Sequence, residues 1–147
     1  MKHITPTQFY IHPVHVDLIG CGGTGSLVLS GLVRLHLAMK SLGHPYGLEV
    51  TAWDPDRVSQ SNIGRQLYVE SEVGLFKSDC LINRCNMHFG LAWKAEARKF
   101  YTKAYYPAHS IIISCVPVYR NCGKFLPAHP CRDDAQRQAG HLCECHA

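Results

Sequence analysis

Four glycines within six positions constrain the fold of this chain more than any other feature. They are Gly20, Gly22, Gly23 and Gly25, and they interrupt the stretch LIGCGGTGSLVLSGL. The apolar run VHVDLIG, residues 14–20, predicts a strand that leads into them. Residues 24–41 carry leucine and valine at helical spacing, which predicts a helix that leads away from them. A strand, a glycine turn and a helix in this order begin a βαβ unit with a parallel sheet.

The rest of the chain continues this alternation of strands and helices. Residues 48–54, LEVTAWD, alternate as a second strand does, and residues 77–89 predict a second helix. We predict two more strands at residues 95–104 and 111–116, and the run IIISCV predicts that the last is buried on both faces. The predicted fold class is therefore α/β, a Rossmann-like and mostly parallel sheet with helices on both faces.

Length and composition fit one globular domain with a short tail. The chain has 147 residues, of which 46% are hydrophobic and 18% charged, and its net charge is +4. We predict one domain over residues 1–126 and an unpatterned tail over residues 127–147. No apolar run approaches the roughly 20 residues that span a bilayer, and the N-terminus lacks a signal-peptide pattern. We therefore expect a cytoplasmic protein with no membrane and no nucleic acid as partner.

The spacing G-x-G-x-x-G of Gly20, Gly22 and Gly25 is typical of a loop that cradles phosphate groups. The first glycine permits a tight turn, the second lets phosphates approach the backbone, and the third lets helix and strand pack closely. Free amides at the helix start favour an anion. Asp54 ends the second predicted strand, where a carboxylate can accept hydrogen bonds from ribose hydroxyl groups. The alternative is a tight turn that binds no ligand.

Polar and basic residues beyond Asp54 bear on which nucleotide binds. Asn62, Arg65 and Gln66 follow in the sequence DPDRVSQSNIGRQLY, and Lys77 lies near the start of the second predicted helix. A triphosphate needs its charge neutralised when one of its P–O bonds breaks, whereas hydride transfer has no general need for these cations. Arg65 and Lys77 therefore favour a triphosphate, and the alternative is that both are solvated surface charges.

Three motifs together resemble the ThiF/MoeB/HesA family, the bacterial relatives of ubiquitin-activating enzymes. They are GCGGTGS at residues 20–26, D-x-D-x-V-x-x-S-N-x-x-R-Q at residues 54–66, and G-x-x-K at residues 74–77. The resemblance runs from about residue 10 to about residue 120. It is strongest to the ThiF-like proteins of the PRTRC gene set.

The resemblance implies that the chain binds ATP and Mg²⁺ and adenylates the C-terminal carboxylate of a small ubiquitin-like or sulfur-carrier-like protein, as a homodimer. The residues that it assigns to nucleotide binding are Gly20, Gly22, Gly23, Gly25, Ser26, Asp54, Asn62 and Gln66. It assigns Arg65 and Lys77 to catalysis at the phosphates, Asp54 to the ribose, and Asp56 to support of the loop. Adenylation needs positioning and charge and no protein nucleophile.

The sequence departs from this family pattern in two respects. Pro117 stands where family members carry an acid that helps to hold Mg²⁺, and a proline cannot ligate a hard cation. Family members also continue well past the length of this chain, so we expect a C-terminally truncated copy. Two alternatives stay open. One is a nucleotide-binding module without turnover, and the other is an NAD- or FAD-dependent oxidoreductase whose Arg65 and Lys77 point away from the glycine loop.

Other residue groups indicate weaker candidates. The cysteines and histidines between Cys122 and His146 could suggest zinc, but no C-x-x-C pair is present, so we expect no metal site there. The stretch WKAEARKFYTKAYY, residues 93–106, interleaves basic and aromatic residues as single-strand nucleic-acid sites do, yet we favour an exposed strand face. We predict that Cys80, Cys85 and Cys115 are core thiols.

Overall fold

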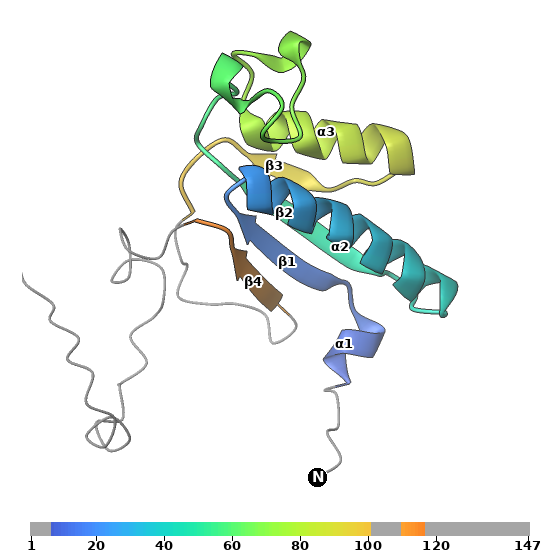
Figure 1. The fold of residues 1–147 in the computed structure, drawn as a ribbon. Coiled ribbons are helices and arrows are strands. Elements are labelled where there is room, and N and C mark those ends of the chain that lie inside the picture. The colour runs from blue at the N-terminus through green and yellow to red at the C-terminus, as the bar shows by residue number, and fades with distance from the viewer. Residues whose placement is uncertain (1–6, 101–109, 117–147) are drawn as a thin grey trace, which may run out of the picture.

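The computed structural model describes residues 7–100 and 110–116 (Figure 1). Its elements in chain order are α1 (Gln8–Ile11), β1 (Val14–Ile19), α2 (Gly23–Ser41), β2 (Leu48–Trp53), the short 3-10 helices η1 (Gln60–Asn62) and η2 (Glu70–Glu72), α3 (Lys77–Phe89), β3 (Lys94–Glu96) and β4 (Ser110–Ser114). The first two predicted strands and both predicted helices are confirmed, with ends that agree to within one residue.

The strands form one parallel sheet of four strands in the order β3-β2-β1-β4. Val14 of β1 pairs with Leu48 of β2, and Ile19 pairs with Trp53, so the two strands end level with each other. The turns that follow β1 and β2 therefore lie side by side at one end of the sheet (Figure 1). The predicted α/β, Rossmann-like fold with a parallel sheet is confirmed.

The hydrophobic core lies between the sheet and the two long helices. Alternate residues of β1 and β2 face the helices and are buried, namely Val14, Val16, Leu18, Leu48, Val50 and Ala52. The helices contribute Leu29, Leu32, Val33, Leu81 and Ile82 to the same cluster. Burial of each large aliphatic side chain contributes about 1.5–3 kcal/mol, so this packing fixes where the two helices begin relative to the strand ends.

Both long helices cover the same face of the sheet, α2 over β1 and β2 and α3 over β2 and β3 (Figure 1). On the opposite face, His15 pairs with Glu49 at 3.2 Å, and the carboxylate of Asp17 accepts a hydrogen bond from the Trp53 indole at 2.7 Å. Within residues 7–100 and 110–116, no long helix covers this second face, so helices on both faces are not observed in that part of the chain.

Two strand predictions need correction. β3 is Lys94–Glu96, not residues 95–104, because the chain bends at Arg98. The Arg98 side chain donates to the Glu96 carboxylate at 2.8 Å and lies 5.2 Å from the centre of the Trp53 ring. Residues 101–109 lie outside the described ranges.

The prediction that β4 is buried on both faces is wrong. Ile111 and Ile112 of this strand are each 41% exposed. β4 lies at the edge of the sheet, next to β1, and α2 packs over β1 and β2 instead. A run of β-branched residues predicts a strand, but burial depends on which element lies above it.

Candidate functional site

The glycine turn after β1 leaves the start of α2 open. Gly20 has a φ of 90°, which favours glycine, and its amide donates to the Trp53 carbonyl at 2.8 Å. Gly25 packs so closely on this turn that a Cβ there would lie 1.8 Å from the Gly20 carbonyl oxygen. α2 has Gly22 as its N-cap, and no side chain caps it. The first amides of α2 therefore lack intrahelical partners and can bind an anion.

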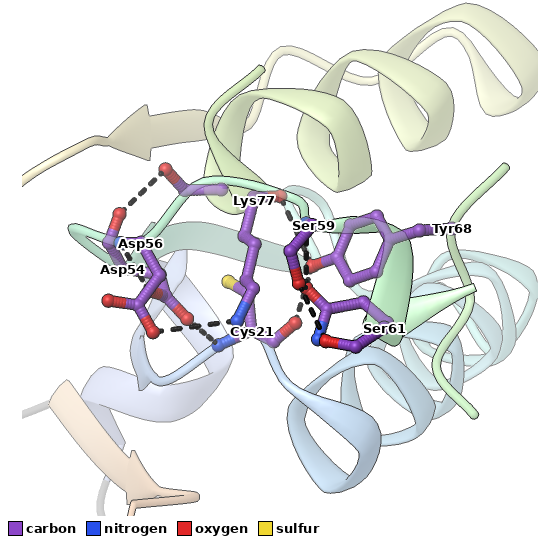
Figure 2. A network of polar contacts seen from close by, with 9 residues as sticks. Cys21, Asp54, Asp56, Ser59, Ser61, Tyr68 and Lys77 are labelled. Carbon is purple, nitrogen blue, oxygen red and sulfur yellow. Dashed lines mark hydrogen bonds and ion pairs between the residues drawn. The ribbon is translucent and has the colours of Figure 1, made fainter. Parts of the chain in front are cut away.

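Asp54 follows β2 and joins the glycine turn to the next loop (Figure 2). Its side chain is buried, with Oδ2 accepting the N–H of Cys21 at 2.6 Å and Oδ1 accepting the N–H of Asp56 at 2.8 Å. Each carboxylate oxygen thus has one backbone donor and keeps lone-pair capacity for a ligand hydroxyl group. The acid that the sequence assigns to ribose lies directly beside the glycine turn.

Backbone pairing of two loop segments brings Lys77 to the same place. The segment Asp56–Val58 runs antiparallel to Gly74–Lys77, with the Lys77 amide donating to the Asp56 carbonyl at 3.0 Å. Lys77 is the first residue of α3 and is only 8% exposed. Its ammonium lies 3.5 Å from the Asp56 carboxylate, which is 68% exposed and therefore solvated. Most of the ammonium charge is thus not neutralised by a buried partner.

The positive charge of Lys77 acts on the thiol of Cys21 in the glycine turn. Burial, more than the charge of Asp54, raises the pKa of the Cys21 thiol to about 12, and the Lys77 ammonium opposes this rise. The thiol stays protonated at neutral pH and is not a nucleophile. Lys77 and the glycine turn therefore share one local environment.

The loop that contains Arg65 lies against the start of α2. Asn62 is buried, and its Oδ1 accepts hydrogen bonds from the amide and the hydroxyl group of Ser59 at 3.0 and 3.1 Å. The loop so formed places the Arg65 carbonyl oxygen 3.8 Å from the position of a Cβ on Gly23. The Arg65 side chain is exposed, and its Nε donates to the Ser61 carbonyl at 2.8 Å. Within the described ranges its two terminal nitrogens make no hydrogen bond.

Two other residues assigned to the nucleotide have side chains that face the protein. Ser26 is 2% exposed, and its hydroxyl group donates to the Gly23 carbonyl at 2.9 Å, so it supports the turn. The Oε1 atom of Gln66 is buried, and no donor to it exists among the residues that the structure describes. A buried acceptor without a donor is unfavourable, so a ligand or water that donates to Gln66 would stabilise this loop.

Tyr68 belongs to this site although the sequence did not indicate it. Its side chain is 4% exposed, its hydroxyl group donates to the Cys21 carbonyl, and the same oxygen lies 3.5 Å from the Lys77 carbonyl (Figure 2). Burial raises the pKa of this hydroxyl group, so it remains a donor. The chain has seven tyrosines, and their spacing does not distinguish Tyr68 from the others.

Asp54→Asn is expected to lower the free energy of unfolding by about 2 kcal/mol, because one carboxylate oxygen becomes an NH2 group that faces a backbone N–H. Urea unfolding followed by circular dichroism measures this loss. Asp17→Asn is the matched control, since an asparagine oxygen can still accept the Trp53 indole proton. Equal stabilities of the two variants would show that the paired amide bonds of Asp54 do not hold the turn.

Some candidates from the sequence fall outside the described ranges. They are Pro117, the tail at residues 127–147 with its cysteines and histidines, and the part of the basic stretch beyond Phe100. In the described part of that stretch, Lys94 pairs with Glu49 at 3.3 Å and Arg98 with Glu96 at 2.8 Å. Opposite charges on the same protein thus already partner these two cations.

The remaining cysteines of the described ranges lie in or against the core. Cys80 is buried in the hydrophobic core, and Cys85 and Cys115 are half-buried and pack against that core. Burial raises the pKa of all three thiols. Among residues 7–100 and 110–116, no three His, Cys, Asp or Glu side chains gather as a metal site would require. In the same ranges, no helix combines the length and the apolar character needed to cross a bilayer.

Comparison with known proteins found similar solved structures and one family whose model matches the chain. The structure is similar to E. coli tRNA N6-threonylcarbamoyladenosine dehydratase, TcdA, in complex with ATP, at 23% identity and a TM-score of 0.48, covering 64% of this chain and 35% of TcdA. It is also similar to E. coli MccB with ATP, at 24% identity and a TM-score of 0.44, covering 62% of this chain and 25% of MccB. The chain thus spans about a third of the length of TcdA. No curated protein matches it. The model of the ThiF family matches residues 4–102, more than half of the chain, and the chain therefore belongs to the ThiF family.

Proposed function

We propose that this protein binds ATP at the end of the sheet where β1 and β2 stop. The observation that carries the proposal is the position of Lys77, a residue that is only 8% exposed and whose side chain lies near Cys21 in the glycine turn from which the uncapped α2 starts (Figure 2). Within the described residues, its one ion-pair partner is the exposed carboxylate of Asp56. A buried ammonium with such weak compensation is unfavourable unless an anion also binds it. A phosphate chain that spans the α2 amides and Lys77 supplies that anion.

The other site residues fit the remaining parts of the nucleotide. Asp54 accepts hydrogen bonds from the ribose, and the exposed guanidinium of Arg65 provides a second cation for the phosphates. Asn62 holds the loop of Arg65 in place, and Gln66 accepts a hydrogen bond beside it. Support for these roles comes from the arrangement of the side chains around the glycine turn and from membership of the ThiF family.

We infer adenylyl transfer as the reaction. An oxygen of a partner's C-terminal carboxylate attacks the α-phosphorus of ATP, the bond from this phosphorus to the pyrophosphate oxygen breaks, and an acyl adenylate and pyrophosphate result. Arg65 and Lys77 stabilise the charge that develops on the phosphates, and the amides at the start of α2 orient them. The partner is a small ubiquitin-like or sulfur-carrier-like protein, and the active form is a homodimer.

A second candidate is a module that binds the nucleotide without turnover. The observation that favours it is Pro117, at the position where the family pattern has an acid for Mg²⁺. A proline removes that ligand, whereas the glycine turn, Asp54 and Lys77 do not depend on it. Loss of the Mg²⁺ ligand therefore removes turnover of the nucleotide and leaves the residues that bind the nucleotide in place.

Calorimetric titration of the full-length protein with ATP and with NAD⁺ tests the proposal. We expect ATP to bind at least about tenfold more tightly than NAD⁺, because two cations face a triphosphate. Exchange of labelled pyrophosphate into ATP, with a ubiquitin-like protein ending in glycine and with or without Mg²⁺, then tests turnover. Tight ATP binding without exchange selects the module, and a preference for NAD⁺ contradicts both candidates.

A further inference from the structure

Both backbone polar groups of Cys21 in the glycine turn are held by side chains from distant parts of the chain (Figure 2). The N–H of Cys21 donates to Asp54 at 2.6 Å, and its carbonyl accepts the hydroxyl proton of Tyr68. Tyr68 is 4% exposed and its ring belongs to the core, so packing fixes the position of the hydroxyl group. The same hydroxyl oxygen lies 3.5 Å from the carbonyl of Lys77, the first residue of α3.

The bond from Tyr68 also determines where the next amide points. The carbonyl of Cys21 and the N–H of Gly22 belong to one peptide group, and no peptide bond in the described ranges is cis. In a trans peptide the carbonyl and the N–H point in opposite directions. Because the carbonyl points into the core at Tyr68, the N–H of Gly22 points out of the core. The space beside Gly22 is also open, since apart from its chain neighbours no described atom lies within 4 Å of the position of a Cβ on Gly22.

We propose that the Tyr68 hydroxyl group is a positioning group of the nucleotide site, which holds the Gly22 N–H outward to bind a phosphate oxygen. The identity of the ligand as ATP rests on the proposed function above. Glycine has no side chain that restricts rotation of this peptide, so without Tyr68 the peptide can turn and remove its N–H from the site. The hydrogen bond at the carbonyl also polarises the peptide and strengthens the N–H as a donor.

Tyr68→Phe tests this role because it removes one oxygen and keeps the buried ring. We expect ATP to bind about tenfold more weakly, as loss of one aligned donor to a charged phosphate predicts. In ¹H–¹⁵N spectra of the ligand-free protein, the Gly22 amide resonance should move away from its wild-type position. Tyr46→Phe, at a tyrosine that is 54% exposed on the loop after α2, is the matched control and should change neither quantity.

The spectra separate this inference from the proposed function. Failure of the wild-type protein to bind ATP contradicts the proposed function, while the Gly22 resonance still reports on Tyr68. An unchanged Gly22 resonance in Tyr68→Phe overturns the inference whatever the affinity, because loss of affinity would then be merely structural. An ATP affinity within about twofold of wild type in a variant whose Gly22 amide has moved overturns it too.

A second replacement covers the case in which Tyr68→Phe does not fold. Incorporation of 3-fluorotyrosine at position 68 keeps the ring and the hydroxyl group and makes that group more acidic, so it is a stronger donor. A shift of the Gly22 resonance in this folded variant supports the inference, and an unchanged resonance contradicts it.

Discussion

Gly25→Ala is expected to destabilise the protein by about 3 kcal/mol or more, which leaves a domain of this size largely unfolded or barely stable. The new methyl group would lie 1.8 Å from the carbonyl oxygen of Gly20 and 2.8 Å from its carbonyl carbon, which are backbone atoms that cannot rotate away. Either α2 moves off the end of β1 or the turn opens, and both changes separate the helix start from the sheet. Urea unfolding followed by circular dichroism measures the loss.

Gly31→Ala is the matched control for this prediction. Gly31 lies in the same helix, and apart from its chain neighbours and the nearby backbone of α2 no described atom lies within 4 Å of the position of its Cβ. Alanine is favoured over glycine in a helix interior by about 0.8–1 kcal/mol, so this variant should be slightly more stable than wild type. If both alanine variants unfold at the same urea concentration, the close approach of α2 to the glycine turn is not a requirement of the fold.

Lys77→Met is expected to weaken ATP binding about 100-fold, or about 2.7 kcal/mol, while the fold persists. The methionine side chain fills nearly the same volume, and the Asp56 carboxylate left behind is 68% exposed and stays solvated. The free energy of unfolding should therefore change by less than about 1 kcal/mol. Calorimetric titration with ATP and urea unfolding measure the two effects on the same preparation.

Lys40→Met is the control for a loss of charge elsewhere. Lys40 is exposed in the last turn of α2, at the opposite end of the helix from the glycine turn, where its ammonium donates to the Pro45 carbonyl at 2.6 Å. This variant lowers the net charge by the same amount and should bind ATP as wild type does. Equal weakening in both variants would mean that Lys77 acts only through the net charge of the protein, and the proposed phosphate contact would then be wrong.

Much of the fold could be predicted because its determinants are local. The alternation in LEVTAWD and the helical spacing of the residues between Thr24 and Ser41 depend on neighbours a few positions away, and the elements found there agree with them. The edge position of β4 could not be predicted in this way. Ile111 shares the face of Val16 and is 41% exposed because α2 packs over other strands. Ile112 shares the opposite face with Asp17 and is equally exposed because no long helix of the described residues covers that face. No pattern within five residues carries that information.

Part of the candidate site could likewise be predicted from the sequence, and part of it could not. The glycine spacing and the acid that closes the second strand suffice to predict the turn and the place of Asp54 beside it, since both follow from the order of a βαβ unit. The engagement of both Asp54 oxygens by the amides of Cys21 and Asp56 was not predictable, because the bond to Cys21 joins residues 33 positions apart.

The sequence by itself determined the order of strands and helices and the position of the glycine turn, because each depends on backbone conformation and on spacing along the chain. Only the tertiary structure decided that Tyr68 meets the Cys21 carbonyl across 47 positions and that the Lys77 ammonium lies 3.5 Å from the Asp56 carboxylate, near the same turn (Figure 2). The physical reason is that such contacts arise when a shared core fixes the separate elements in space, and a core is a property of the packed chain and of no single segment.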